Sequence, residues 1–175
     1  GATAPVGRLD LDTGCKSGGV LTDATLVLVD TTDRLSPLEF DRARTSIERA
    51  AMQVPVGGKL TVVMIDPVQP LSPKVLFSRC SPGRTDETSG LTQGQRKTAD
   101  KYSQQYWQPL ADAIASLKTA ADSKTSPILL TLTAMTTRPD FDARVRNRRL
   151  IVAGDMVEHH NGLSHYQPQR DLWSE

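Results

Sequence analysis

The sequence predicts an α/β domain with a doubly wound, mostly parallel sheet and helices on both faces. Nearly continuous apolar runs occur at residues 25–29, 59–65 and 149–153, as in strands that are buried on both faces. Segments with apolar residues at helical spacing separate these runs, and an aspartate follows each run: Asp30, Asp66 and Asp155. Strands that alternate with helices are typical of a parallel sheet, whose ligands bind outside the carboxyl ends of the strands.

The first strand, at residues 25–29, leads into the first helix. The tetrapeptide Ser36-Pro37-Leu38-Glu39 combines a capping box with a proline at the first helical position. Apolar residues recur at helical spacing as far as Val54, and the proline and glycines of residues 55–58 end the helix. The second strand then covers residues 59–65.

The middle of the chain predicts an edge strand and a long helix. Several prolines precede a short strand at residues 74–79, and this placement suits the edge of a sheet. A helix is expected at residues 95–121, kinked or split by Pro109. A further helix begins at Thr125-Ser126-Pro127 and continues to Thr136, and the last strand covers residues 149–153.

Composition limits the classes of partner. The chain has 175 residues with a net charge of +1, which suits one domain and gives little field to attract nucleic acid or a membrane surface. We therefore expect no nucleic-acid partner, and no apolar run reaches the roughly 18 residues of a membrane span. Residues 1–23 lack periodicity and are assigned to an irregular N-terminal arm, and residues 24–175 to the α/β domain.

The two cysteines, Cys15 and Cys80, leave two interpretations open. They are either unrelated buried thiols or one disulfide in an exported protein. Both lie in glycine- and serine-rich surroundings that predict loops rather than core, and this favours the disulfide. A periplasmic or exported location is accordingly favoured over a cytoplasmic one.

Three loops occur in an informative order at the predicted strand ends and helix start. They are Asp30-Thr31-Thr32-Asp33-Arg34, the helix start at residues 126–128, and the end of the last strand at residues 153–155. Over about residues 24–160 this order resembles the von Willebrand factor A fold, a Rossmann-like architecture. In that family a D-x-S-x-S loop, a T-P-L helix start and a strand ending in T-D-G converge on one divalent cation. The resemblance implies a metal-ion-dependent adhesion site that takes Mg²⁺ or Mn²⁺ and is formed by Asp30, Thr32, Ser126 and Asp155.

The first loop departs from the family pattern at its fifth position. A hydroxyl is expected there, but the residue is Arg34, whose guanidinium cannot ligate a metal and repels one nearby. We therefore expect a degenerate site in which Arg34 or another basic group pairs with Asp30 or Asp155. The alternative is purely structural, with Asp30 and Thr32 satisfying backbone groups at a turn and Ser126 capping a helix.

A looser resemblance is to uncharacterised bacterial proteins with a von Willebrand A-like domain. They combine a D-T-T-D-x-L-[ST] loop, a C-x-P-G loop and an S-P-I helix start, which correspond here to residues 30–36, 80–83 and 126–128. The family fold continues with two more strands after the third loop, whereas about 20 residues follow Asp155 here. We expect a fold shortened after the fourth strand or a piece of a longer chain. An exposed sheet edge would then need cover from the arm, the tail or a partner.

Other constellations give weaker predictions. His159, His160 and His165 lie close together near Glu158, but a solvated loop is favoured over a transition-metal site. A cysteine hydrolase could use Cys80 with Asp30 and Lys59, yet Cys80 does not sit at the strand-to-helix turn that would activate it. Four arginines, at positions 144, 146, 148 and 149, could touch nucleic acid or an acidic partner. A solvated turn, balanced by the aspartates at 140 and 142, is favoured for them.

These patterns favour a non-enzymatic interaction module that binds another protein through the loops at the carboxyl ends of its strands. The residues expected to contact the partner are Asp33, Arg34, Ser36, Glu158 and His159. The competing function is a metal-dependent hydrolase that uses Asp30 and Asp155 with a metal-activated water. The sequence favours the module over an enzyme and leaves the oligomeric state open.

Overall fold

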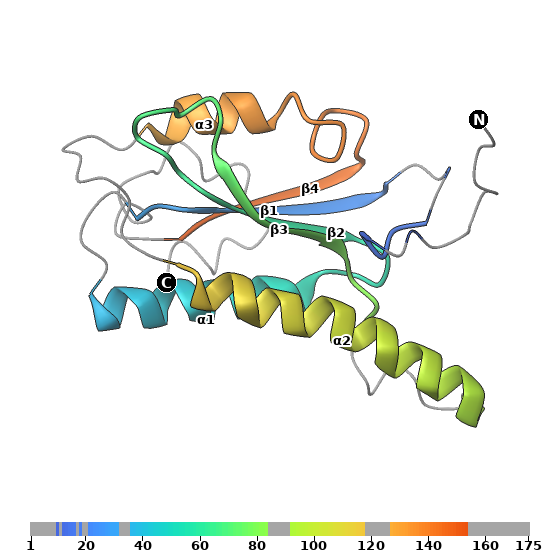
Figure 1. Cartoon of the computed structure of the whole chain (residues 1–175). Coiled ribbons are helices and arrows are strands. Elements are labelled where there is room, and N and C mark those ends of the chain that lie inside the picture. Colours follow the sequence, from blue (N-terminus) through green and yellow to red (C-terminus); the bar gives the residue numbers. More distant parts are fainter. Residues whose placement is uncertain are drawn as a thin grey trace.

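The protein is a three-layer α/β structure with one four-stranded sheet (Figure 1). The structure, a computed structural model, describes residues 10, 12–16, 18, 21–31, 36–83, 92–117 and 127–153. In chain order its elements are β1 (Asp23–Val29), α1 (Pro37–Gln53), β2 (Lys59–Met64), β3 (Lys74–Cys80), α2 (Gln93–Ala115), α3 (Ile128–Met135) and β4 (Asn147–Ala153). Within the described ranges, none of the helices combines the length and apolar character that crossing a membrane requires.

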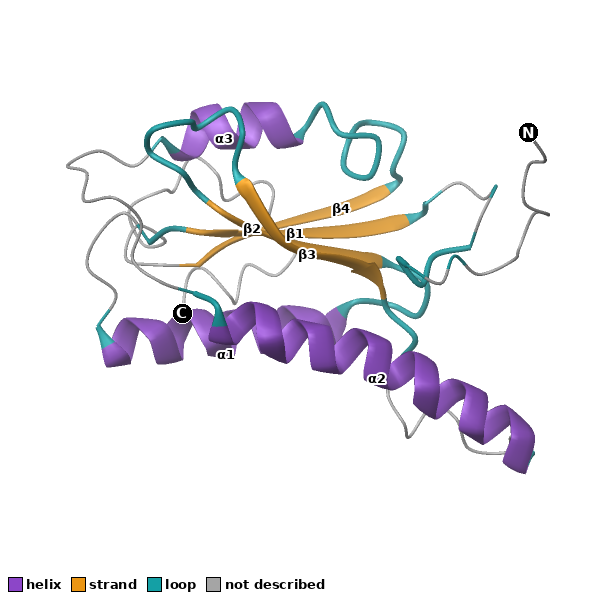
Figure 2. Ribbon diagram, viewed as in Figure 1, coloured by secondary structure: helices purple, strands orange, loops and turns teal. Residues whose placement is uncertain are grey.

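The sheet has the order β3-β2-β1-β4, with β1 parallel to both of its neighbours and β3 antiparallel to β2. The predicted α/β class with a mostly parallel sheet is therefore confirmed, and the strand expected at an edge is indeed an outer strand. Helices α1 and α2 cover one face and α3 covers the other (Figure 2). We call the end of the sheet where β1, β2 and β4 begin the amino edge, and the end where they finish the carboxyl edge.

The core consists of two apolar layers, one on each face of the sheet. Alternation along β1 sends Val27 and Val29 toward α1 and α2, and Leu26 and Leu28 toward α3. Because both faces are covered, β1 consists almost wholly of buried residues. This explains why the strand is a continuous apolar run in the sequence.

Helix α1 begins and ends as its sequence signals predict. The Oγ of Ser36 accepts a hydrogen bond from the backbone N–H of Glu39 at 3.2 Å, and Pro37 occupies the first turn. No basic residue lies in the last turn of α1, but Arg149 of β4 donates to the carbonyl oxygen of Gln53 at 3.3 Å. A cation at this place satisfies a terminal carbonyl and complements the helix dipole.

Helix α2 differs from the prediction. It is one helix across Pro109, so the split that was one of the two expected outcomes does not occur, and it ends at Ala115 rather than near residue 121. Tyr106 and Leu110, which flank the proline, are both buried in the core layer beneath the sheet. Packing of this face keeps the helix together although the proline removes one backbone hydrogen bond.

The N-terminal arm contributes a turn that is attached to β3. The Oδ1 of Asp10 accepts hydrogen bonds from the backbone N–H groups of Asp12 and Thr13, at 2.8 and 3.4 Å. The backbone N–H of Cys80 donates to the carbonyl oxygen of Thr13 at 2.8 Å. This turn therefore covers the last residue of the outer strand β3, as expected of an arm that protects a sheet edge.

Candidate functional site

The carboxyl edge contains a topological switch point between β1 and β4. From β1 the chain moves to β2 and then to β3 on one side, whereas β4 lies on the other side of β1. In doubly wound sheets, a reversal of the strand order of this kind leaves room for a ligand between the two strands. The backbone N–H of Asp30 donates to the carbonyl oxygen of Ala153 at 2.8 Å, which holds the two strand ends together.

Two adjacent polar residues are buried at this point. Asp30 is 7% exposed, and Thr31 is 1% exposed. The Oγ1 of Thr31 has no hydrogen-bond partner among the residues that the structure describes. A buried hydroxyl without a partner costs about 1–3 kcal/mol, so its presence beside a buried carboxylate is typical of a functional edge rather than a stabilising one.

Two further residues of the predicted loops, Ser36 and Asp66, are described by the structure. Ser36 is a half-buried helix cap, so its hydroxyl has a structural role. Asp66, at the end of β2, accepts hydrogen bonds from the backbone N–H groups of Val68 and Gln69 at 2.8 and 3.3 Å. The other predicted residues lie outside the described ranges, together with His160 and His165: Thr32, Asp33, Arg34, Ser126, Asp155, Glu158 and His159.

The donor chemistry at the carboxyl edge suits a hard cation only in part. Asp30 supplies a carboxylate and Thr31 a hydroxyl, the kinds of oxygen ligand that Mg²⁺ prefers. Among the described residues, no group of three or more His, Cys, Asp and Glu side chains could hold a metal ion. A complete cation site would therefore need the predicted ligands outside these ranges. Thr31 was missed by the sequence pattern, which points to positions 30 and 32.

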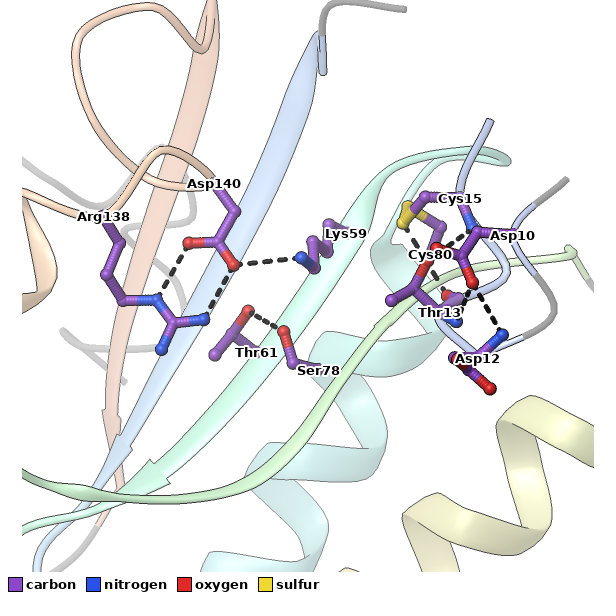
Figure 3. Close-up of a disulfide and its surroundings, with 10 residues drawn as sticks. All are labelled: Asp10, Asp12, Thr13, Cys15, Lys59, Thr61, Ser78, Cys80, Arg138 and Asp140. Carbon is purple, nitrogen blue, oxygen red and sulfur yellow. Dashed lines mark hydrogen bonds and ion pairs between the residues drawn. A yellow bond between two sulfur atoms is a disulfide. The ribbon is translucent and has the colours of Figure 1, made fainter. Parts of the chain in front are cut away.

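The amino edge holds the predicted disulfide. Cys15 and Cys80 are bonded with a sulfur–sulfur distance of 1.96 Å and a Cα–Cα distance of 5.0 Å (Figure 3). Cys80 pairs in register with Lys59, the first residue of β2, so the disulfide lies at the end of the sheet opposite Asp30. The pairing confirms the disulfide interpretation and leaves no free thiol at Cys80 for a cysteine hydrolase.

A compact ion cluster lies at the same edge. Asp140 accepts two hydrogen bonds from Arg138, at 3.0 and 2.9 Å, and pairs with the Nζ of Lys59 at 3.0 Å (Figure 3). Burial disfavours the charged carboxylate, but the hydrogen bonds and charges of Arg138 and Lys59 outweigh it and lower the pKa of Asp140 to about 2. Nearby, the hydroxyls of Thr61 and Ser78 are hydrogen-bonded at 3.1 Å.

The basic cluster around the start of β4 contains both ion-paired and exposed arginines. Arg144 forms an ion pair with Asp142 at 2.7 Å, and its hydrogen bonds lower the pKa of that carboxyl. Arg146 and Arg148 are exposed, and Arg148 donates a hydrogen bond to the carbonyl oxygen of Phe141 at 3.4 Å. The expected balance by both aspartates is therefore incomplete, because Asp140 is paired with Arg138 and Lys59 instead.

Comparison of the chain with protein-family models, with curated proteins and with solved structures found no match. The structure thus establishes an α/β fold with a mostly parallel sheet, a disulfide at the amino edge and a buried polar pair at the carboxyl edge.

Proposed function

We propose that this chain is a von Willebrand A-like interaction module that binds another protein through the loops at its carboxyl edge. The observation that carries the proposal is the burial of Asp30 and Thr31 at the switch point between β1 and β4. The outer strand β3 and the long helix α2 follow β2 in the order that the resemblance implies, and this order also supports the proposal.

The loop chemistry supports binding more than reaction. The described residues at this edge contribute the carboxylate of Asp30 and the hydroxyl of Thr31, and among the described residues no group of three or more His, Cys, Asp and Glu side chains could hold a metal ion for catalysis. If a cation is held, the residues that hold it are Asp30, Thr32, Ser126 and Asp155, and its charge would attract a carboxylate of the partner. Without a cation, the same loops make direct polar contacts.

A disulfide is typical of proteins that mature outside the reducing cytosol. We place the module in an oxidising compartment, such as the bacterial periplasm or the exterior of the cell. Its partner is then another exported protein or the outer part of a membrane protein.

The test is selection of binding peptides from a random phage-displayed library, carried out once in Mg²⁺ and once in EDTA. We expect selected peptides to bind the wild type and to lose at least about tenfold in affinity with Asp30→Asn, as for a central polar contact. Asp66→Asn is the matched control, since it removes the same charge at the same edge. Calorimetric titration with Mg²⁺ and Mn²⁺, on the wild type and Asp155→Ala, shows whether a cation takes part.

Two results would count against the module. Selection without enrichment, or peptides that bind wild type and Asp30→Asn equally, would remove the carboxyl edge as the contact surface. Turnover of p-nitrophenyl phosphate or p-nitrophenyl acetate in Mn²⁺, abolished by Asp30→Asn and kept by Asp66→Asn, would establish the hydrolase in its place.

A further inference from the structure

The start of β4 concentrates positive charge on one side of the amino edge. Asp140 is shared by Arg138 and Lys59, and Asp142 is paired with Arg144. Arg146 and Arg148 are exposed beside these pairs. The five cations and two carboxylates leave an excess of three positive charges, in a chain whose whole net charge is +1. Such a local excess attracts acidic partners.

The two exposed arginines lie at the entry to β4. Arg148 is the second residue of the strand, and Arg146 lies in the bend that immediately precedes it. Their charges can therefore attract carboxylates of a segment that pairs with the start of β4.

The outer side of β4 is not paired within the described sheet, where β1 is the neighbour of this strand. The N–H of Asn147 donates to Thr22, and the carbonyl of Ala153 accepts from Asp30, so odd-numbered residues of β4 face β1. Because backbone groups alternate along a strand, the N–H groups of Arg148, Leu150 and Val152 point away from β1.

We propose that the outer side of β4, with Arg146 and Arg148 at its start, docks an extended acidic segment of a partner protein. Backbone pairing with Leu150 and Val152 supplies affinity, and the arginines select carboxylates and set the register. The small excess of charge favours a peptide over nucleic acid, whose binding proteins commonly contact 6–10 phosphates. The arginines of this surface lie at the amino edge, away from the proposed contact loops of the carboxyl edge, so the chain would hold two partners, or two parts of one.

The probe is a fluorescein-labelled peptide of alternating glutamate and valine, titrated against the full chain by fluorescence anisotropy at low salt. We expect saturable binding that weakens about tenfold or more in the double variant Arg146→Glu/Arg148→Glu. The matched control is Arg42→Glu/Arg49→Glu, which makes the same charge change at exposed positions of α1. Thermal denaturation of both variants checks that they fold.

Amide hydrogen exchange followed by NMR locates the peptide. The amides of Arg148, Leu150 and Val152 should exchange more slowly when the peptide is bound, whereas that of Ile151, which faces β1, should change little. The proposal is overturned if those three amides are already protected in the free chain, if both double variants lose binding equally, or if labelled oligo-dT of matched charge binds more tightly than the peptide. The test does not involve Asp30, so its failure would leave the proposed function standing.

Discussion

Two pairs of polar side chains and the buried polar pair at the carboxyl edge differ in how their groups are satisfied. At the amino edge, Asp140 has Arg138 and Lys59 as partners, and in the middle of the sheet the hydroxyl of Thr61 has that of Ser78. At the carboxyl edge, the hydroxyl of Thr31 is buried without a partner among the described residues. Buried polar groups with hydrogen-bond partners stabilise a fold, whereas a buried polar group without a partner is tolerated where it serves a function. The comparison assigns stability to the ion cluster at the amino edge and binding to the carboxyl edge.

The disulfide should provide the largest single contribution to the amino edge. Removing it as Cys15→Ala/Cys80→Ala frees a loop whose ends are separated by 65 residues. We expect the free energy of unfolding to fall by about 4 kcal/mol in the chain-entropy account. The melting temperature should fall by roughly 10 °C in a chain of this size. Urea denaturation of both proteins measures the first quantity, and calorimetry the second.

The single variant Cys80→Ala provides the control for the disulfide prediction. It breaks the same bond and should show a loss similar to that of the double variant. A difference below about 1 kcal/mol between wild type and the double variant would mean that the reduced, unfolded chain retains structure of its own. The amino edge would then owe its stability to the ion cluster.

The ion cluster should make the second-largest contribution to stability. Asp140→Asn removes the charge that Arg138 and Lys59 share and leaves both cations half-buried without their partner. We expect a loss of about 1–2 kcal/mol at pH 7. The pKa of Asp140 is lowered to about 2, below the value of about 3.9 in an unfolded chain. Its stabilisation is therefore complete above pH 4 and disappears as the pH falls toward 2.

Urea denaturation of wild type and Asp140→Asn across pH 2–7 measures this effect. The stability difference between the two proteins should shrink as the pH falls from 4 to 2. Asp142→Asn is the matched control, because Asp142 also pairs with an arginine but belongs to an exposed pair that should contribute little. A difference that stays constant over this pH range would show that packing, and not charge, accounts for the effect of Asp140→Asn.

The sequence predicts those features that local chemistry determines. The cap at Ser36 follows from four consecutive residues, and the buried strands follow from their continuous apolar runs. The glycine- and serine-rich surroundings of Cys15 and Cys80 favoured their pairing, although the expectation of two loops is wrong for Cys80, which is the buried last residue of β3. Asp30 could be placed at the carboxyl edge because it directly follows a strand.

Features that depend on distant contacts were not predictable. Lys59 and Asp140 meet only because β2 and the loop after α3 share the amino edge. Helix α2 continues across Pro109 because Tyr106 and Leu110 pack in the core. Helix propensity does not include such tertiary packing. Thr31 has the same side chain as its neighbour Thr32, so the pattern alone could not show that the hydroxyl of Thr31 is buried without a partner among the described residues.

The smallest expected change in stability tests the contrast between Thr31 and Thr61 most directly. Thr31→Val and Thr61→Val each replace a buried hydroxyl by a methyl group of nearly the same shape. Thr61→Val breaks a hydrogen bond with Ser78 and should lower stability by about 1 kcal/mol. Thr31→Val removes a hydroxyl without a described partner, so it should leave stability unchanged or raise it by up to about 1 kcal/mol.

Urea denaturation of the two valine variants beside the wild type measures both effects, and Thr31→Ser, which keeps the hydroxyl, is the control for Thr31. The sign of the stability change caused by Thr31→Val distinguishes the two outcomes. A loss as large as that of Thr61→Val would mean that the Thr31 hydroxyl makes a stabilising hydrogen bond in solution, so that Thr31 follows the same rule as Thr61. A gain accompanied by weaker peptide binding would show that the hydroxyl is kept for its partner at the expense of the fold.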